Sequence, residues 1–206
     1  MNFLGYAHWF MSMSISQLKN NSIPVHQNIY DISIVAKYLD TITIKEILKF
    51  HDTTLTHYMI FTKENYSTIY EQVEVLSREF NIHYRACVGS LIYILSKRVY
   101  LCFSVQRLVK FSSNPGKVNF EGLVHWLIYI RYSKNLGFRY YAKIEDASIS
   151  DLLRQAGIRN ESQLMVFSHY ICQYCIDNGR ITGASIVFYQ GGPIYYFTHV
   201  PGSIPE

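Results

Sequence analysis

The sequence predicts an α+β fold, with a β-hairpin and a helix, then a central bundle of amphipathic helices, then a three-stranded antiparallel sheet. Two short extended runs occur near the beginning, helical periodicity dominates the middle, and three β-rich runs occur in the last third. Of the 206 residues, 49% are apolar and 17% are charged, so the chain has enough apolar surface for a packed core.

The first expected elements are a hairpin and a helix. Residues 7–15 alternate and are rich in aromatics, residues 23–27 form a second extended run, and the Lys-Asn-Asn-Ser at 19–22 has turn chemistry. Residues 29–39 repeat apolar side chains every three or four positions, which predicts a helix. Its expected inward face is Ile29, Ile32, Val35, Ala36 and Leu39. Residues 41–66 show little periodicity and are expected to form a loop or linker.

Four further amphipathic helices are predicted, near residues 67–80, 84–95, 101–109 and 117–131. Ser67-Thr68 with Glu71 resembles a capping box, and the Ser-Ser-Asn-Pro-Gly run at 112–116 separates the last two helices. The expected apolar stripes are Val73, Leu76 and Phe80; Val88, Leu91, Ile92 and Leu95; Leu101, Val105, Leu108 and Val109; and Phe120, Leu123, Val124, Leu127 and Ile130.

The last third is expected to be mainly β-structure. Residues 135–142 predict a short strand and a loop, and residues 150–157 predict a helical turn. Residues 163–168, 182–189 and 193–199 predict three strands, with Gly191-Gly192 as a hairpin turn. Since no helix is predicted after them, this sheet is expected to be incomplete, with an exposed apolar face and an open edge that favour self-association.

The cysteines and the first residues of the sequence indicate the cellular compartment of the protein. Cys87 and Cys102 lie in apolar stretches and are expected to be buried, inert thiols. The apolar opening lacks a basic region and a cleavage site, and it is too short to span a bilayer. These features predict an intracellular protein, cytoplasmic or nuclear, without disulfides and without membrane association.

One segment carries a specific resemblance. Residues 84–93 read YRACVGSLIY and resemble the YRxxVGSLxYL segment of copia-type retrotransposon reverse transcriptases, which follows the palm. Residues 97–100, KRVY, stand where that family has a Thr-Arg-Pro-Asp run, and Gln27 with Tyr30 resembles its QxxY. Phe167-Ser168 and the GRITG at 179–183 resemble the opening of the tethered ribonuclease H domain.

The resemblance implies three regions. Residues 1–66 correspond to the end of the reverse transcriptase and a linker, residues 67–142 to the thumb or connection, and residues 143–206 to a truncated ribonuclease-H-like sheet. The resemblance also implies that the chain is a degenerate and truncated part of a retrotransposon pol polyprotein.

The carboxylates that the family's chemistry needs are not found. Polymerases of this kind use two divalent metals held by paired palm aspartates, which lie upstream of the matched residues, and this chain has no Asp-Asp pair. His169 occupies the position of the first ribonuclease H aspartate, and a neutral imidazole is a poor ligand for magnesium. Ile181 replaces a usual serine, and the chain stops at Glu206, before the helix that carries the next carboxylate. We therefore expect no catalysis and no bound cofactor, although active family members use magnesium.

Two groups of residues are candidate binding sites, although an ordinary solvent-exposed surface also accounts for them. Lys97, Arg98, Arg107, Lys110 and Lys117 are candidate contacts to the backbone of an RNA–DNA hybrid or duplex, but a solvated helix face also explains them. His169, Cys172, Cys175 and His199 could form a zinc site, although a single C-x2-C pair is a weak signal.

The expected function follows from these residues and the resemblance. The first hypothesis is an inactive retroelement remnant that retains weak, non-specific RNA–DNA binding. The second is a protein-interaction fragment that associates with an intact retroelement polymerase. A residual ribonuclease H is the third.

Overall fold

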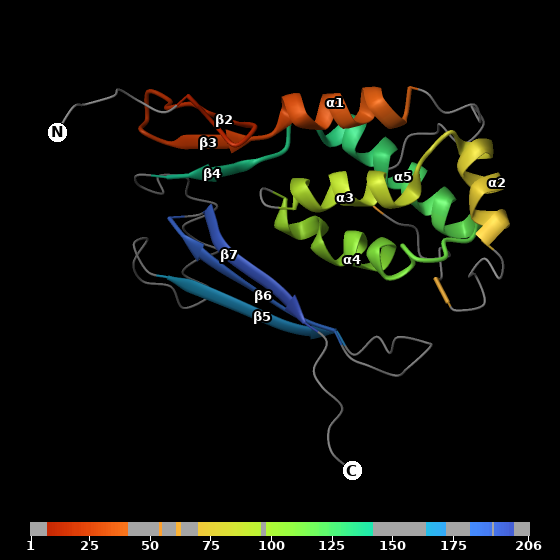
Figure 1. Cartoon of the computed structure of the whole chain (residues 1–206). Coiled ribbons are helices and arrows are strands. Elements are labelled where there is room, and N and C mark those ends of the chain that lie inside the picture. The colour runs from red at the N-terminus through yellow and green to blue at the C-terminus, as the bar shows by residue number, and fades with distance from the viewer. Residues whose placement is uncertain are drawn as a thin grey trace, which may run out of the picture. The chain divides into compact units, whose positions relative to one another are not determined.

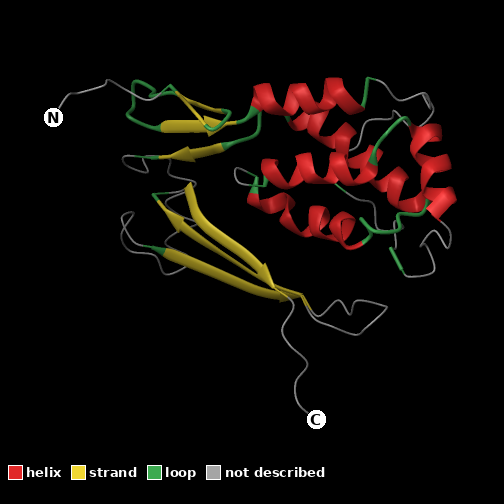
Figure 2. Ribbon diagram, viewed as in Figure 1, coloured by secondary structure: helices red, strands yellow, loops and turns green. Residues whose placement is uncertain are grey.

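Helices and strands segregate along the chain, which confirms the α+β class (Figures 1 and 2). The computed structural model describes residues 8–40, 54, 61–62, 70–95, 98–141, 164–171, 182–190 and 192–199. The chain divides into two units. We call Met1–His26 with Gly137–Glu206 the sheet unit and Gln27–Leu136 the helical unit.

The first sheet is four-stranded and antiparallel, in the order β1 (Trp9–Phe10), β2 (Met13–Ile15), β3 (Ile23–His26) and β4 (Phe138–Tyr140). The predicted hairpin is confirmed as the β2–β3 pair. The first run also folds back on itself, because Met11 and Ser12 adopt positive φ angles of 47° and 60° between β1 and β2. Two successive positive φ values are the geometry of a two-residue type I′ hairpin turn.

The second sheet has the order β5 (Met165–Ile171), β6 (Thr182–Tyr189) and β7 (Gly192–His199), all antiparallel, and confirms the three predicted strands. Gly192 pairs with Tyr189 and lies in the strand rather than in the turn, while Gln190 adopts a positive φ. Within the sheet unit, β4 meets β7: the Tyr140 hydroxyl donates to the Pro193 carbonyl at 2.9 Å. A Cβ on Gly192 would lie 2.3 Å from the Tyr140 ring, so this approach requires glycine.

The helical unit contains α1 (Asn28–Tyr38), α2 (Tyr70–Phe80), α3 (Tyr84–Ile94), η3 (Val99–Leu101), α4 (Cys102–Lys110) and α5 (Lys117–Ser133). Helix α5 packs against α1, α2, α3 and α4. All five residues of its predicted stripe are buried, and so are Trp126 and Ile128 beside the stripe. A helix that is buried on nearly every side forms the centre of this unit.

Aromatic and polar contacts join the helices around α5. Phe80 of α2 and Tyr84 of α3 both pack on Phe120 of α5, each with ring centroids 5.2 Å apart. The Tyr84 hydroxyl donates to the Leu108 carbonyl of α4 at 3.0 Å, and the indole N–H of Trp126 donates to Ser104 Oγ at 3.0 Å. These bonds satisfy polar groups that would be costly to bury alone.

The inward face of α1 was predicted only in part. Val35 and Leu39 are buried as expected, but Ile29 and Ile32 are 58% and 47% exposed. Asp31, Ile34 and Tyr38 are buried instead, since Asp31 finds a cationic partner in the core. Ala36, Ile92 and Val109 were also expected to face inward and are exposed; for Ile92, the core of α3 is filled by side chains at neighbouring positions.

Several predicted features lie outside the described residues. They are most of the loop at 41–66, the Ser67-Thr68 cap, the helical turn at 150–157 and Gly191. The break at residues 112–116 is confirmed, and there the Asn119 side chain accepts a hydrogen bond from the Gly116 N–H at 2.8 Å, which organises the beginning of α5.

Candidate functional site

A buried ion pair lies inside the helical unit. Asp31, in the first turn of α1, and Arg98, between α3 and η3, are 0% and 1% exposed, and Arg98 Nη2 lies 2.6 Å from Asp31 Oδ2. Sixty-seven positions separate the two residues, so the contact is purely tertiary. A buried charge of either sign needs such a partner, because an isolated charge in the core is very costly.

Arg98 also binds the end of α5. Its Nη1 donates to Ser133 Oγ at 2.9 Å and its Nη2 donates to the Ser133 carbonyl at 2.6 Å. The last carbonyls of a helix lack intrahelical partners and carry partial negative charge, so a guanidinium is a favourable cap there. One side chain therefore connects the beginning of α1 to the end of α5.

Burial dominates the electrostatics of this cluster. Burial raises the pKa of Asp31 to about 6, and the neighbouring Arg98 charge opposes that rise. Burial also raises the pKa of Tyr100 to about 12, again against the effect of Arg98, and a hydrogen bond with Tyr129 adds to the rise. Asp31 Oδ1, Arg98 Nε and both amide atoms of Gln27 have no hydrogen-bond partner within the part of the chain that the structure describes.

The cluster is suited to holding helices together rather than to chemistry. It contains one carboxylate, already paired with a guanidinium, whereas two-metal phosphoryl chemistry needs several carboxylates at one point. In the described ranges, no group of three or more His, Cys, Asp or Glu side chains converges on a common point.

The five basic candidates do not share one environment. Arg98 differs from the expected surface cation because its guanidinium is buried against Asp31, and Lys97 lies outside the described residues. Arg107 lies over the rings of Phe61 and Phe103, at 5.9 and 6.0 Å from their centroids. Lys110 is exposed in the last turn of α4, 5.6 Å from the centroid of the Phe111 ring.

Lys117 completes the basic surface around the α4–α5 turn. It is exposed at the first position of α5, and its Nζ lies 3.8 Å from Glu79 Oε1. We call Arg107, Lys110 and Lys117 the α4–α5 basic patch. An exposed pair at that distance contributes little and leaves the lysine able to exchange partners.

The residues of the zinc alternative are described only in part. His169 pairs with Ala184, and Ala184 pairs with Thr198, whereas His199 pairs with Gly183. Cys172 and Cys175 lie outside the described residues, as do the side chains of both histidines.

The remaining cysteines behave as core residues. Cys87 and Cys102 are buried, as predicted. Burial raises the pKa of the Cys87 thiol far above its usual range, so the reactive thiolate is not formed near neutral pH.

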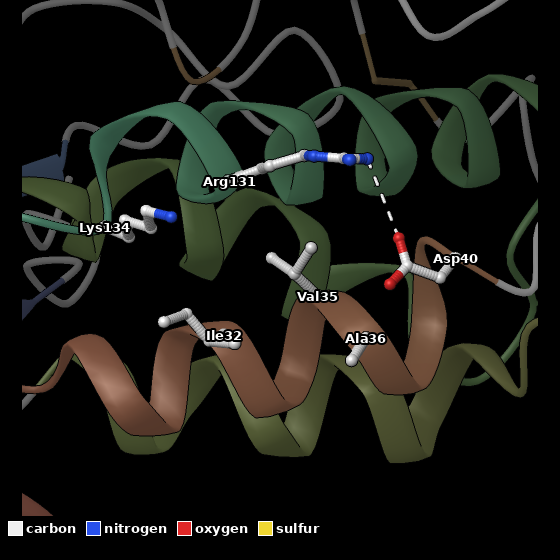
Figure 3. Close-up of a pocket in the computed structure, with 6 residues that line it drawn as sticks. All are labelled: Ile32, Val35, Ala36, Asp40, Arg131 and Lys134. Carbon is white, nitrogen blue, oxygen red and sulfur yellow. Dashed lines mark ion pairs between the residues drawn. The ribbon is translucent and has the colours of Figure 1, made fainter.

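A groove between α1 and α5 was missed by the sequence reasoning. A cavity of about 180 Å³ is lined by Ile32, Val35 and Ala36 of α1, together with Asp40, Arg131 and Lys134 (Figure 3). We call it the α1–α5 groove. Arg131 Nη1 lies 3.6 Å from Asp40 Oδ1 across it. The sequence signal was present, because Ile29, Ile32 and Ala36 lie on one helical stripe that was assigned to the core.

Comparison with known proteins identifies no relative: no family model, no curated protein and no solved structure matches the chain. None of the helices described here is long and apolar enough to cross a membrane.

Proposed function

We propose that the chain is a catalytically inactive remnant of a copia-type retrotransposon reverse transcriptase and ribonuclease H polyprotein, with residual, sequence-independent binding to RNA–DNA hybrid or duplex. The motif order along the sequence supports the family assignment. The α4–α5 basic patch supports the binding, and it is the single structural observation on which that part rests.

The chemistry of the patch fits a phosphate backbone and not a base sequence. Arg107 and Lys110 are three residues apart in the last turn of α4, so they share a helix face, and Lys117 follows after the turn at 111–116. Lys110 and Lys117 are exposed, and Arg107 is half-buried. Cations at a surface attract phosphates because their binding releases condensed counterions, and this attraction carries no sequence information. Since Glu79 lies beside Lys117, the expected binding is weak.

Fluorescence anisotropy of the full chain with a labelled RNA–DNA hybrid tests this proposal. Three phosphate contacts give a log–log salt slope of about −2.7, so affinity should fall about 40-fold between 50 and 200 mM salt. The dissociation constant should be micromolar or weaker at the lower salt. Lys110→Glu should weaken binding, whereas Lys134→Glu, an equal charge change in the α1–α5 groove, should leave it nearly unchanged. Binding that ignores salt, or cleavage of the hybrid with magnesium or manganese, would contradict the proposal.

A second candidate function is protein interaction through the second sheet, including association with an intact retroelement polymerase. Its support is the exposed apolar side chains on the two outer strands, β5 and β7: Val166, Phe167, Ile194, Tyr195 and Phe197. Strand β5 lies at one edge of that sheet, where backbone groups can pair with another strand. Concentration-dependent association of the chain would favour this function over nucleic-acid binding.

A further inference from the structure

The α1–α5 groove has an apolar floor and a charged rim. Val35 is buried at its base, and Ile32 is exposed beside it. Figure 3 shows these α1 side chains opposite Arg131 and Lys134 of the α5 end, with Asp40 facing Arg131. The rim thus carries two cations and one carboxylate, a local excess of one positive charge.

The apolar floor continues along α1 beyond the cavity. Ile29 precedes Ile32 by three residues, and both are about half exposed. Ile29, Ile32 and Ala36 therefore form a stripe at helical spacing that the core of the helical unit does not use. A stripe of this kind beside a second helix has the shape of a site for an amphipathic helix.

The size of the cavity decides between a small molecule and a peptide. Pockets for small ligands enclose about 300–1,000 Å³. The groove offers about 180 Å³, which suits a single large apolar side chain and not a whole cofactor or metabolite. A side chain inserted from a helix would bring neighbouring residues of that helix over the rim.

We propose that the α1–α5 groove binds a short amphipathic helix of a partner protein, which inserts one apolar side chain between Ile32 and Val35 and places acidic side chains near Lys134 and Arg131. Charge complementarity selects the acidic partner, and burial of Ile32 and of its neighbour Ile29 supplies the affinity. The site is separate from the α4–α5 basic patch, so it does not depend on nucleic-acid binding.

The test uses the full chain and two labelled helical peptides of about 20 residues. Both carry leucines at positions i, i+3, i+4 and i+7; one carries glutamates on its polar face and the other carries lysines in the same places. The acidic peptide should bind with a dissociation constant on the order of 10–100 μM and the basic peptide at least about tenfold more weakly. Equal binding of the two peptides, or no binding of the acidic one, would overturn the proposal.

Variants locate the binding. Ile32→Asp should weaken binding of the acidic peptide about tenfold or more, whereas Ile92→Asp should not, although Ile92 is similarly exposed on α3. Lys134→Glu should weaken peptide binding and spare hybrid binding, and Lys110→Glu should do the reverse. An unchanged thermal transition shows that each variant is folded. Equal losses in Ile32→Asp and Ile92→Asp would mean non-specific adhesion and would refute the site.

Sedimentation of the chain alone tests whether a second copy of the chain, and not a partner protein, occupies the groove. A second copy of the chain in the groove would produce self-association that Ile32→Asp abolishes and that acidic peptide competes away. That result would overturn the assignment to a different protein.

Discussion

At the scale of single residues, the Asp31–Arg98 pair is a buried contact between two segments of the helical unit that are far apart in the sequence. Both charges are removed from water, and the 2.6 Å contact between them offsets only part of that cost. A pair of this kind contributes little net stability as a whole, but the loss of one member leaves the other charge buried alone. The pair explains how α1 can carry a charged residue, Asp31, on its buried face.

The first prediction concerns the difference between removing one charge of the pair and removing both. Arg98→Met should lower the free energy of unfolding by about 3–5 kcal/mol, because it leaves the Asp31 carboxylate buried without its cationic partner and removes the bonds from Arg98 to Ser133. Adding Asp31→Leu to Arg98→Met should restore most of that loss. Urea unfolding of the wild type, both single variants and the double variant measures the coupling. Additive effects of the two substitutions would show that the residues do not interact.

The second prediction concerns pH. Burial raises the pKa of Asp31 from 3.8 to about 6, so the folded state holds its proton more tightly than the unfolded state does. The stability from this group is therefore fully present below pH 3.8 and is lost as pH rises through about 6, by up to about 3 kcal/mol.

Comparison of the wild type with Asp31→Asn from pH 4 to pH 8 isolates this carboxyl. The wild type should lose stability relative to the variant as pH increases. Arg98 is the nearest charge, and Tyr100, whose pKa is raised by burial to about 12, keeps its proton throughout this range. A relative stability that rises with pH would reverse the sign and show that Arg98 outweighs burial.

At the scale of elements, α5 depends on a close approach by a neighbouring aromatic. A Cβ on Gly122 would lie 2.6 Å from Phe61 Cζ, and Phe61 itself is buried with its ring 5.8 Å from that of Phe111. Helix propensity favours alanine over glycine by about 1 kcal/mol, but overpacking of a tight core costs about 1–3 kcal/mol. Packing should outweigh propensity at this position.

The third prediction uses two helical glycines. Gly122→Ala should destabilise the protein by about 1–2 kcal/mol, whereas Gly89→Ala should stabilise it by up to about 1 kcal/mol, because nothing lies within 4 Å of a Cβ at Gly89. Chemical unfolding of both variants measures the difference. Phe61→Leu in the Gly122→Ala background should recover part of the loss; equal stabilisation by both alanines would show that the Phe61 contact does not matter.

Periodicity predicted where helices form better than which face they bury. The stripe of α5 was predicted correctly, but the burial of Trp126 and Ile128 follows from helices on several sides, which no local pattern encodes. In α1, the apolar stripe suggested that Ile29 and Ile32 face inward. Burial of Asp31 rests on Arg98 far along the chain, so that part of the site could not be predicted from the sequence of α1.

The prediction of turns from residue type is limited in the same way. The Asn-rich turn before β3 and the Pro-Gly break before α5 carry residues with strong local preferences, and both were predicted. The turn at Met11-Ser12 carries none, yet both residues adopt positive φ because the pairing of β1 with β2 requires it. The pairing of β1 with β2, and not the local preference of these two residues, therefore determines this turn.

At the scale of the whole molecule, the second sheet exposes apolar side chains on both faces. Register places Val166, Val187 and Tyr195 on one face and Phe167, Ile186 and Tyr196 on the other. Val166 is 64% exposed and lies on the edge strand β5. An edge strand with exposed apolar side chains is prone to pair with another chain.

The fourth prediction follows from that edge. Val166→Lys should weaken self-association of the chain about tenfold, because a charge on an edge strand opposes strand pairing. Val75→Lys is the matched control, since Val75 is similarly exposed but lies on α2. Sedimentation velocity over a range of concentrations measures the effect. Identical behaviour of the two variants would place the interface elsewhere.

The pairing of β3 with β4 has a consequence for how the chain can be cut and rejoined. Val25 pairs with Phe138, and a Cβ on Gly137 would lie only 3.1 Å from His26 Cα, so the chain leaves the sheet unit and re-enters it at nearly the same point. Gln27–Leu136 is therefore an insertion between two adjacent strands. A short turn from His26 to Gly137 would replace Gln27–Leu136 and keep the register of β3 with β4, because these strands are already adjacent.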